Sequence, residues 1–130
     1  MKQALFEAAI SAMARCHAPY SKFPVGAAIL CDDGKIYSGA NIEVVSFPEG
    51  WCAETSAIAH MVMAGGKRIV EVAVVAEKLE MCSPCGGCRQ RLAEFATAGT
   101  LVHMGGPGGI ARSVRMDELL PFAFETGSLA

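Results

Sequence analysis

The sequence predicts a single α/β domain, a three-layer α/β/α sandwich built on a mixed sheet of about five strands. Two apolar runs, residues 25–31 and 69–76, the second interrupted only by Glu71, are typical of strands covered on both faces. Segments with helical periodicity lie before, between and after these runs, and a strand, helix, strand order implies a parallel crossover. At 130 residues the chain can bury a sizeable core, so we treat residues 1–130 as one domain.

The first half of the chain predicts one helix followed by a hairpin. Residues 3–16 place Phe6, Ile10 and Met13 at helical spacing, and Pro19 should end this helix. Residues 20–24 should form a loop that leads into the strand at 25–31. The turn residues at 32–35, Asp-Asp-Gly-Lys, predict a hairpin whose second strand covers residues 36–41.

The second half predicts two helices and the remaining strands. After a loop at 43–51, a helix should begin near Cys52 and end at Gly65 and Gly66, because glycine is common at helix C-termini. A later helix should begin near Cys85 and end at Gly99. The other expected elements are strands at 69–76, 100–104 and 110–114, the last at a sheet edge, and one helical turn at 117–120.

Composition limits the classes of partner. Apolar residues make up 52% and charged residues 18%, with a net charge of −2, so no basic excess favours a nucleic-acid polymer and the expected partner is a small molecule. No apolar run reaches the length of a membrane span, and Glu7 stands where a signal peptide needs apolar residues. We therefore expect a cytoplasmic protein, in which the six cysteines are reduced and favour metal ligation over disulfides.

Two cysteine motifs carry the chemistry: Cys52-Ala53-Glu54 and Pro84-Cys85-Gly86-Gly87-Cys88. Cysteines three positions apart can bind one ion from a single turn, and Cys52 would supply a third thiolate. Three protein ligands with a fourth position for water or substrate are typical of catalytic zinc. Glu54, beside a ligand but not itself one, could relay protons. Both motifs should begin helices, whose N-termini favour thiolates.

Other interpretations of these residues remain open at this stage. The three cysteines could be buried core thiols, and Glu54 could simply favour a helix N-terminus. Cys82 extends the second motif to C-x-x-C-x-x-C, which could hold an iron–sulfur cluster. With Cys52, Cys85 and Cys88 it could instead complete a closed, non-catalytic zinc site.

Several motifs together resemble the cytidine deaminase family in its small three-cysteine form. The zinc deaminase signature H-x-E…P-C-x-x-C is matched with Cys52 in place of the histidine. The resemblance covers most of the chain and includes Tyr-Ser-Lys-Phe-Pro-Val-Gly-Ala-Ala at 20–28, Asn-Ile-Glu at 41–43, Cys-Arg-Gln at 88–90 and Leu-Leu-Pro at 119–121. It implies zinc-dependent hydrolytic deamination of cytidine and deoxycytidine, in pyrimidine salvage, by a homotetramer with one zinc per chain.

The resemblance also implies roles for individual residues. Glu54 would be the general acid and base, and Cys52, Cys85 and Cys88 the zinc ligands. Arg89 is the best candidate for withdrawing charge from the sulfurs, with Thr55 and Gln90 as further supporting residues. Substrate would be held at the base edge by backbone near Ala53 and Cys85, at the ribose by Asn41 and Glu43, and at the base faces by Phe23 and, from a neighbouring subunit, Phe124.

Three features depart from the family pattern. Thr55 follows the catalytic glutamate where an arginine is common, and Val-Val-Ser-Phe at 44–47 replaces the common Asn-Ala-x-Tyr. Phe47, which stands at an expected substrate-binding position, therefore lacks the hydroxyl that helps to bind ribose in the family. Glu49 and Trp51 are also unusual just before the first ligand. These departures motivate an alternative in which the same chemistry acts on a modified cytosine nucleoside or another aminated heterocycle.

Overall fold

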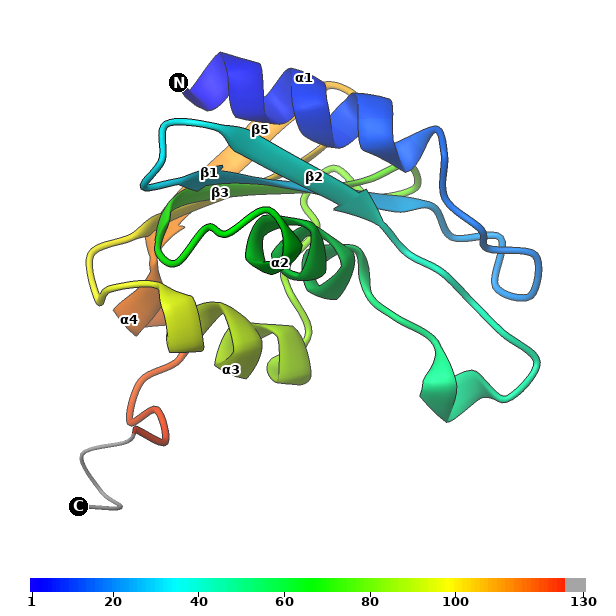
Figure 1. Ribbon diagram of the computed structural model, residues 1–130. Helices are drawn as coiled ribbons and strands as arrows, with labels where there is room; N and C mark the ends of the chain where they lie inside the picture. Colours follow the sequence, from blue (N-terminus) through cyan, green and yellow to red (C-terminus); the bar gives the residue numbers. More distant parts are fainter. Residues whose placement is uncertain (126–130) are drawn as a thin grey trace.

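A five-stranded sheet in the order β2-β1-β3-β4-β5 forms the middle layer of the computed structural model, which describes residues 1–125 (Figure 1). The strands are β1 (Val25–Cys31), β2 (Ile36–Ala40), β3 (Ile69–Ala76), β4 (Leu101–Gly106) and β5 (Gly109–Arg115). The pair β3–β4 is parallel and the other three pairs are antiparallel. The predicted mixed sheet is therefore confirmed, with β5 at an edge.

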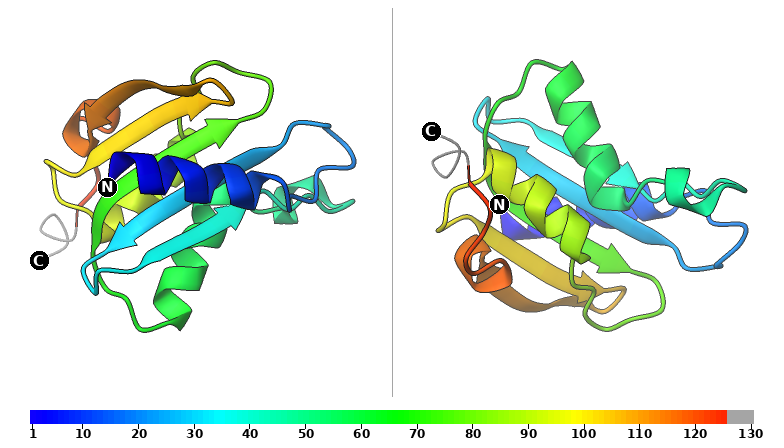
Figure 2. Two further views of the ribbon diagram at one scale, coloured as in Figure 1. Left: turned by 90° about the horizontal axis from the view of Figure 1, so that it is seen from above. Right: turned by 90° about the horizontal axis from the view of Figure 1, so that it is seen from below.

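Helix α1 (Lys2–Met13) covers one face of the sheet (Figure 2). Its residues Leu5, Ala9 and Met13 are buried against Ala28 and Val75 of the sheet. Gly26 permits the close approach, because a Cβ at this position would lie 2.0 Å from the carbonyl oxygen of Ala9. The glycine at position 26 thus determines how closely α1 lies on β1.

Helices α2 (Ala53–Met63) and α3 (Gly86–Phe95) cover the opposite face, and the short helix α4 (Met116–Leu119) lies beside α3 (Figures 1 and 2). Gly39 of β2 lets α2 approach, because a Cβ there would lie 2.4 Å from the backbone nitrogen of Ala57. The larger core cluster, which includes Ile29, Met61 and Leu92, fills this side. The three-layer architecture follows from these two packed faces.

Two helices end earlier than the sequence predicts. Helix α1 stops at Met13, before Pro19, because the chain turns to form a bridge between His17 and Ile42. Helix α3 stops at Phe95 rather than near Gly99, because the backbone nitrogen of Thr97 donates to the hydroxyl of Thr100 at 3.0 Å. In both cases contacts between separate segments override helical propensity.

The topology brings the two cysteine motifs together. Strand β1 lies between β2 and β3 and is antiparallel to both, so β2 and β3 run in the same direction. Helix α2 follows β2 and α3 follows β3, so both helices begin at the same edge of the sheet. In α/β sheets, ligands commonly bind outside the carboxyl ends of the strands.

Candidate metal centre and substrate pocket

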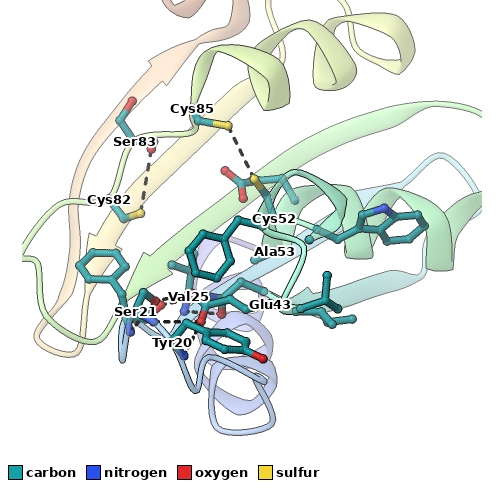
Figure 3. A pocket seen from close by; sticks show the side chains of 17 residues that line it. Tyr20, Ser21, Val25, Glu43, Cys52, Ala53, Cys82, Ser83 and Cys85 are labelled. Carbon is teal, nitrogen blue, oxygen red and sulfur yellow. Dashed lines mark hydrogen bonds between the residues drawn. The ribbon is translucent and has the colours of Figure 1, made fainter.

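Three thiols converge where α2 and α3 begin. The sulfurs of Cys52, Cys85 and Cys88 all lie within 4.8 Å of one another. Those of Cys52 and Cys85 are 3.7 Å apart, as Figure 3 shows by the dashed line between them. A tetrahedral zinc with Zn–S bonds of about 2.3 Å separates its sulfurs by about 3.8 Å. The donor set therefore fits zinc in both chemistry and spacing.

The helix termini set the electrostatics of the thiols. Cys52 and Cys85 occupy the N-cap positions of α2 and α3, and Cys88 lies in the first turn of α3. The Cys88 thiol donates to the sulfur of Cys52, which lowers the pKa of Cys52 and raises that of Cys88. Unpaired N–H groups at both helix N-termini favour negative charge at this point. Both helix N-termini therefore favour negative charge at the place where the three sulfurs meet.

Glu54 lies beside the sulfurs in the first turn of α2. Its side chain is only 4% exposed, and burial raises the pKa of its carboxyl group. Its own backbone N–H, Cys88 and the charge of Arg91 oppose that shift of the pKa, in this order of effect. A buried carboxyl with a raised pKa, facing a pocket, is suited to accept and return protons near neutral pH.

Cys82 does not join the thiol cluster. Among residues 1–125, the group of side chains able to hold a metal contains the three cysteines above and not Cys82. The Cys82 sulfur instead points toward the carbonyl oxygen of Ser83 at 4.0 Å (Figure 3). Burial raises the pKa of this thiol to about 11, which keeps it protonated. The geometry thus disfavours the four-thiolate and iron–sulfur alternatives.

A pocket of about 540 Å³ opens in front of the thiols and Glu54 (Figure 3). This volume lies within the usual range for small-molecule sites. Five residues that the sequence assigns to substrate binding line it, namely Phe23, Asn41, Glu43, Phe47 and Ala53. Tyr20, Val44 and Trp51 also line the pocket, although the sequence did not assign them to the site.

At the polar end of the pocket, Glu43 binds the loop that precedes β1. Its carboxylate accepts hydrogen bonds from the backbone nitrogens of Tyr20 and Ser21, each at 3.0 Å, and from the Ser21 hydroxyl. These donors, the Ser21 hydroxyl first, lower the pKa of Glu43. Glu43 therefore stays ionised and fixes the loop before β1. Sequence reasoning missed Ser21, although it lies in the quoted motif at 20–28.

Asn41 stabilises the same loop through hydrogen bonds to its backbone. Its amide nitrogen donates to the carbonyl oxygen of Phe23 at 2.8 Å, and its amide oxygen accepts from the backbone nitrogen of Val25 at 3.0 Å. A side-chain amide has two N–H donors and two oxygen lone pairs, so each end keeps capacity for one further partner. Asn41 thus positions Phe23 and can still bind a ligand.

The supporting residues differ from expectation. The Arg89 guanidinium, expected to withdraw charge from the sulfurs, bonds to the carbonyl oxygens of Pro84 and Leu119 at 2.9 Å and to the Ser83 hydroxyl at 2.8 Å. The guanidinium that contacts a ligand sulfur belongs to Arg91, which lies 4.0 Å from the Cys88 sulfur. Arg91 is one turn from the metal motif, so helical spacing could have identified it.

Thr55 and Gln90 have separate roles in the structure. The Thr55 hydroxyl lies 3.7 Å from the Cys88 sulfur. The Gln90 amide donates to the carbonyl oxygen of Phe124 at 3.0 Å and so holds the C-terminal segment rather than a thiol. Phe124 itself is 64% exposed and is not among the residues that line this pocket within one chain.

Comparisons with known proteins agree with this geometry. Residues 1–104 match the family model described as the cytidine and deoxycytidylate deaminase zinc-binding region. A cytidine deaminase from Halalkalibacterium halodurans is 42% identical over 123 residues, which cover 95% of this chain and 93% of the relative. One from Sporosarcina psychrophila is 40% identical over 89% of this chain and 85% of its own length.

Solved structures give the same result. The crystal structure of cytidine deaminase from Burkholderia pseudomallei superposes with a TM-score of 0.89 at 37% identity, covering 95% of this chain and 99% of that one. That from Mycobacterium tuberculosis gives a TM-score of 0.84 at 37% identity, with coverage of 95% and 96%. The chain therefore belongs to the cytidine and deoxycytidylate deaminase family of zinc enzymes, and Cys52, Cys85 and Cys88 form a cluster that could hold a metal ion.

Proposed function

We propose that this enzyme hydrolyses cytidine and deoxycytidine to uridine and deoxyuridine, with release of ammonia. One observation carries the proposal: a cluster of three thiols with spacing that fits zinc lies at a pocket of nucleoside size, which two of these thiols and the buried Glu54 line. The relatives named above are cytidine deaminases, which supports the same substrate here.

Cys52, Cys85 and Cys88 would hold the zinc, and Glu54 would transfer the protons of the reaction. Zinc held by three protein ligands lowers the pKa of a bound water to about 7 and so supplies a nucleophile at neutral pH. Glu54 takes the proton of the attacking water and delivers it to ring nitrogen 3 as the new C–O bond forms at carbon 4. Glu54 then carries a proton to the leaving amino group, and the C–N bond breaks to release ammonia. The raised pKa of Glu54 suits both transfers.

The rest of the pocket orients the nucleoside. Backbone groups near Ala53 and Cys85 hold the edge of the base, and Phe23 packs on one of its faces. Asn41 and Glu43 bind the ribose hydroxyls, and both are already ordered by the loop at 20–25. This assignment of roles rests on the resemblance together with the residues that line the pocket.

The proposed assembly is a homotetramer with shared active sites. Phe122 and Phe124 are both highly exposed near the C-terminus, and Val45, Phe47 and Trp51 are exposed beside the pocket. Contact between copies of the chain would bury both groups and bring Phe124 to a neighbouring base. None of the helices within residues 1–125 has the length and apolarity needed to span a bilayer. We place the enzyme in the cytoplasm, in pyrimidine salvage, on the sequence arguments above.

Ammonia release from cytidine, measured with zinc content on the same sample, tests the proposal. Turnover with about one zinc per chain is the expected result, since three ligands hold one ion. A zinc-loaded protein that releases no ammonia from cytidine or deoxycytidine would contradict the substrate assignment.

A second candidate keeps the chemistry and changes the substrate. Val44 and Phe47 give the pocket an apolar wall where the family commonly has polar side chains. This wall favours a modified cytosine nucleoside or another aminated heterocycle. A panel of such compounds decides between the two candidates: ammonia from a modified nucleoside but not from cytidine selects the second.

A further inference from the structure

We infer that Arg91 is the residue that balances the negative charge of the zinc-binding thiolates, acting through Cys88. The inference rests on the proposed function and deepens it. It concerns an exposed arginine in the middle of α3.

The need for a cation follows from counting charges. Three thiolates and one Zn²⁺ give a centre of net charge −1, and the Glu54 carboxylate adds a second negative charge beside it. Excess charge on the sulfurs weakens zinc as a Lewis acid, unless donors around the ligands withdraw it. Helix N-termini supply part of this, but their effect is equivalent to about half a charge each.

The Arg89 guanidinium does not contact the sulfurs but binds oxygen atoms. Arg89 follows Cys88 directly, yet its guanidinium is bonded to two carbonyl oxygens and a hydroxyl, as described above. Those bonds tie the loop before α3 to the end of α4 at Leu119. Arg89 thus stabilises the shape of the metal loop, and its fixed fork of donors points toward oxygen atoms.

Arg91 reaches back toward the start of its own helix. It lies three residues after Cys88, on the same face, and side chains in helices lean toward the N-terminus. Its guanidinium nitrogen lies 4.0 Å from the Cys88 sulfur. A cation near a helix N-terminus is unfavourable by itself, so this position requires a nearby anion. A thiolate at Cys88 provides one.

Gly87 makes room for this arrangement. A Cβ at position 87 would lie 3.1 Å from the guanidinium nitrogen of Arg91, which is tighter than an ordinary contact. The guanidinium therefore packs directly over the glycine, one turn before it.

The Cys88 sulfur has a neutral contact on its other side. Thr55, at the start of α2, places its hydroxyl 3.7 Å from the same sulfur. Cys88 is fully buried between the two helices. The Cys88 sulfur thus has a cation, Arg91, on the side of α3 and a neutral hydroxyl, Thr55, on the side of α2. An arginine at position 55 would approach the same sulfur from the opposite helix.

Zinc affinity of the purified protein, measured by competition with a chelator, tests the inference. Zinc replaces protons on neutral thiols and leaves a site of net charge −1, so a neighbouring cation favours the bound state. Arg91→Gln should weaken zinc binding by about 10-fold and lower kcat by a similar factor, with KM little changed. The zinc affinity of Arg91→Lys should lie between those of Arg91→Gln and the wild type, because lysine keeps the positive charge but lacks the planar guanidinium group.

Two further variants separate a charge effect from a structural one. Thr55→Arg combined with Arg91→Gln should recover part of the zinc affinity, because it returns a cation to the same sulfur from α2. Arg112→Gln, the same substitution on the edge strand β5, is the matched control and should change neither quantity. Zinc affinity of Arg91→Gln within about twofold of wild type, or equal losses in Arg91→Lys and Arg91→Gln without rescue, would overturn the inference.

The metal measurement also keeps this inference separate from the proposed function. Zinc affinity is read with the metal alone and needs no substrate. A wild-type protein that binds zinc but does not release ammonia from cytidine would refute the proposed substrate. The affinities of the Arg91 variants would still decide whether this residue balances the thiolates.

Discussion

The sheet carries a cluster of ionisable side chains on each face, and the two clusters differ in what they leave unsatisfied. On the face of α2 and α3, three thiols form a cluster beside a pocket that is lined by two of them, Cys52 and Cys85, together with Glu54. On the face of α1, His103 is 2% exposed, with one ring nitrogen 2.6 Å from the Ser113 hydroxyl and the other 2.5 Å from the Glu71 carboxylate.

Both clusters contain a buried titratable group, but only one is arranged for chemistry. The two nitrogens of His103 each have a partner from a neighbouring strand, so the cluster ties β3, β4 and β5 together. The three sulfurs have mainly one another, which leaves room for an ion, and Glu54 opens onto the pocket. Burial of a titratable group therefore does not by itself identify a functional site. A functional site is identified by polar or ligand atoms that have free bonding capacity and face a cavity.

Glu54→Gln should produce the largest effect and separate the two clusters most clearly. The amide keeps the shape of the side chain but cannot take a proton, so turnover should fall by about 10³-fold while zinc is retained. Steady-state kinetics and metal content on one preparation measure both. The matched control is Glu71→Gln, which removes the carboxylate of the other cluster and should leave turnover per folded molecule near wild type. Substantial activity in Glu54→Gln would refute its role.

Cys88→Ser should come next in magnitude. Loss of one of three thiolates should weaken zinc binding by at least about 100-fold and remove turnover with it. Chelator competition gives the affinity. Cys82→Ser is the comparison, since Cys82 lies outside the sulfur cluster and the variant should keep its zinc. Zinc lost from Cys82→Ser and kept by Cys88→Ser would reverse the ligand assignment.

His103→Leu should affect stability and spare catalysis. The leucine leaves the Ser113 hydroxyl and the Glu71 carboxylate without their partner, which should cost about 2 kcal/mol of unfolding free energy. Denaturant unfolding measures the loss, and zinc content and kcat per folded molecule should not change. A variant of normal stability but lower kcat would show that the two clusters are coupled.

Ser21→Ala should give the smallest effect, visible as a change with pH. Hydrogen bonds from Ser21 and Tyr20 hold the pKa of Glu43 below its ordinary 4.5. They therefore add stability above that value, and the gain disappears as pH falls through the lowered pKa. Ser21→Ala should lower Tm relative to the wild type at about pH 7, and this difference in Tm should disappear near about pH 3. A difference in Tm that is constant across this range would remove Glu43 as its cause.

Much of the fold was predictable because its signals are local. The apolar runs that became β1 and β3, the turn at 32–35 and the helix starts at Cys52 and Cys85 each depend on neighbouring residues. The early ends of α1 and α3 were not predictable, because they depend on contacts of His17 with Ile42 and of Thr97 with Thr100. Such contacts have no signature in helical periodicity.

The site divides in the same way. The sequence by itself determined the chemical types at the metal site, namely three thiols and an adjacent carboxyl, because they follow from motif spacing and side-chain chemistry. The pair Asn41 and Glu43 came from the resemblance to the family. Only the tertiary structure decided that Cys82 lies apart, that Arg91 rather than Arg89 contacts a sulfur, and that Ser21 holds Glu43. The physical reason is that hydrogen bonds and charge contacts depend on directions and distances of a few ångströms, which only the packing of the helices and the loop at 20–25 fixes.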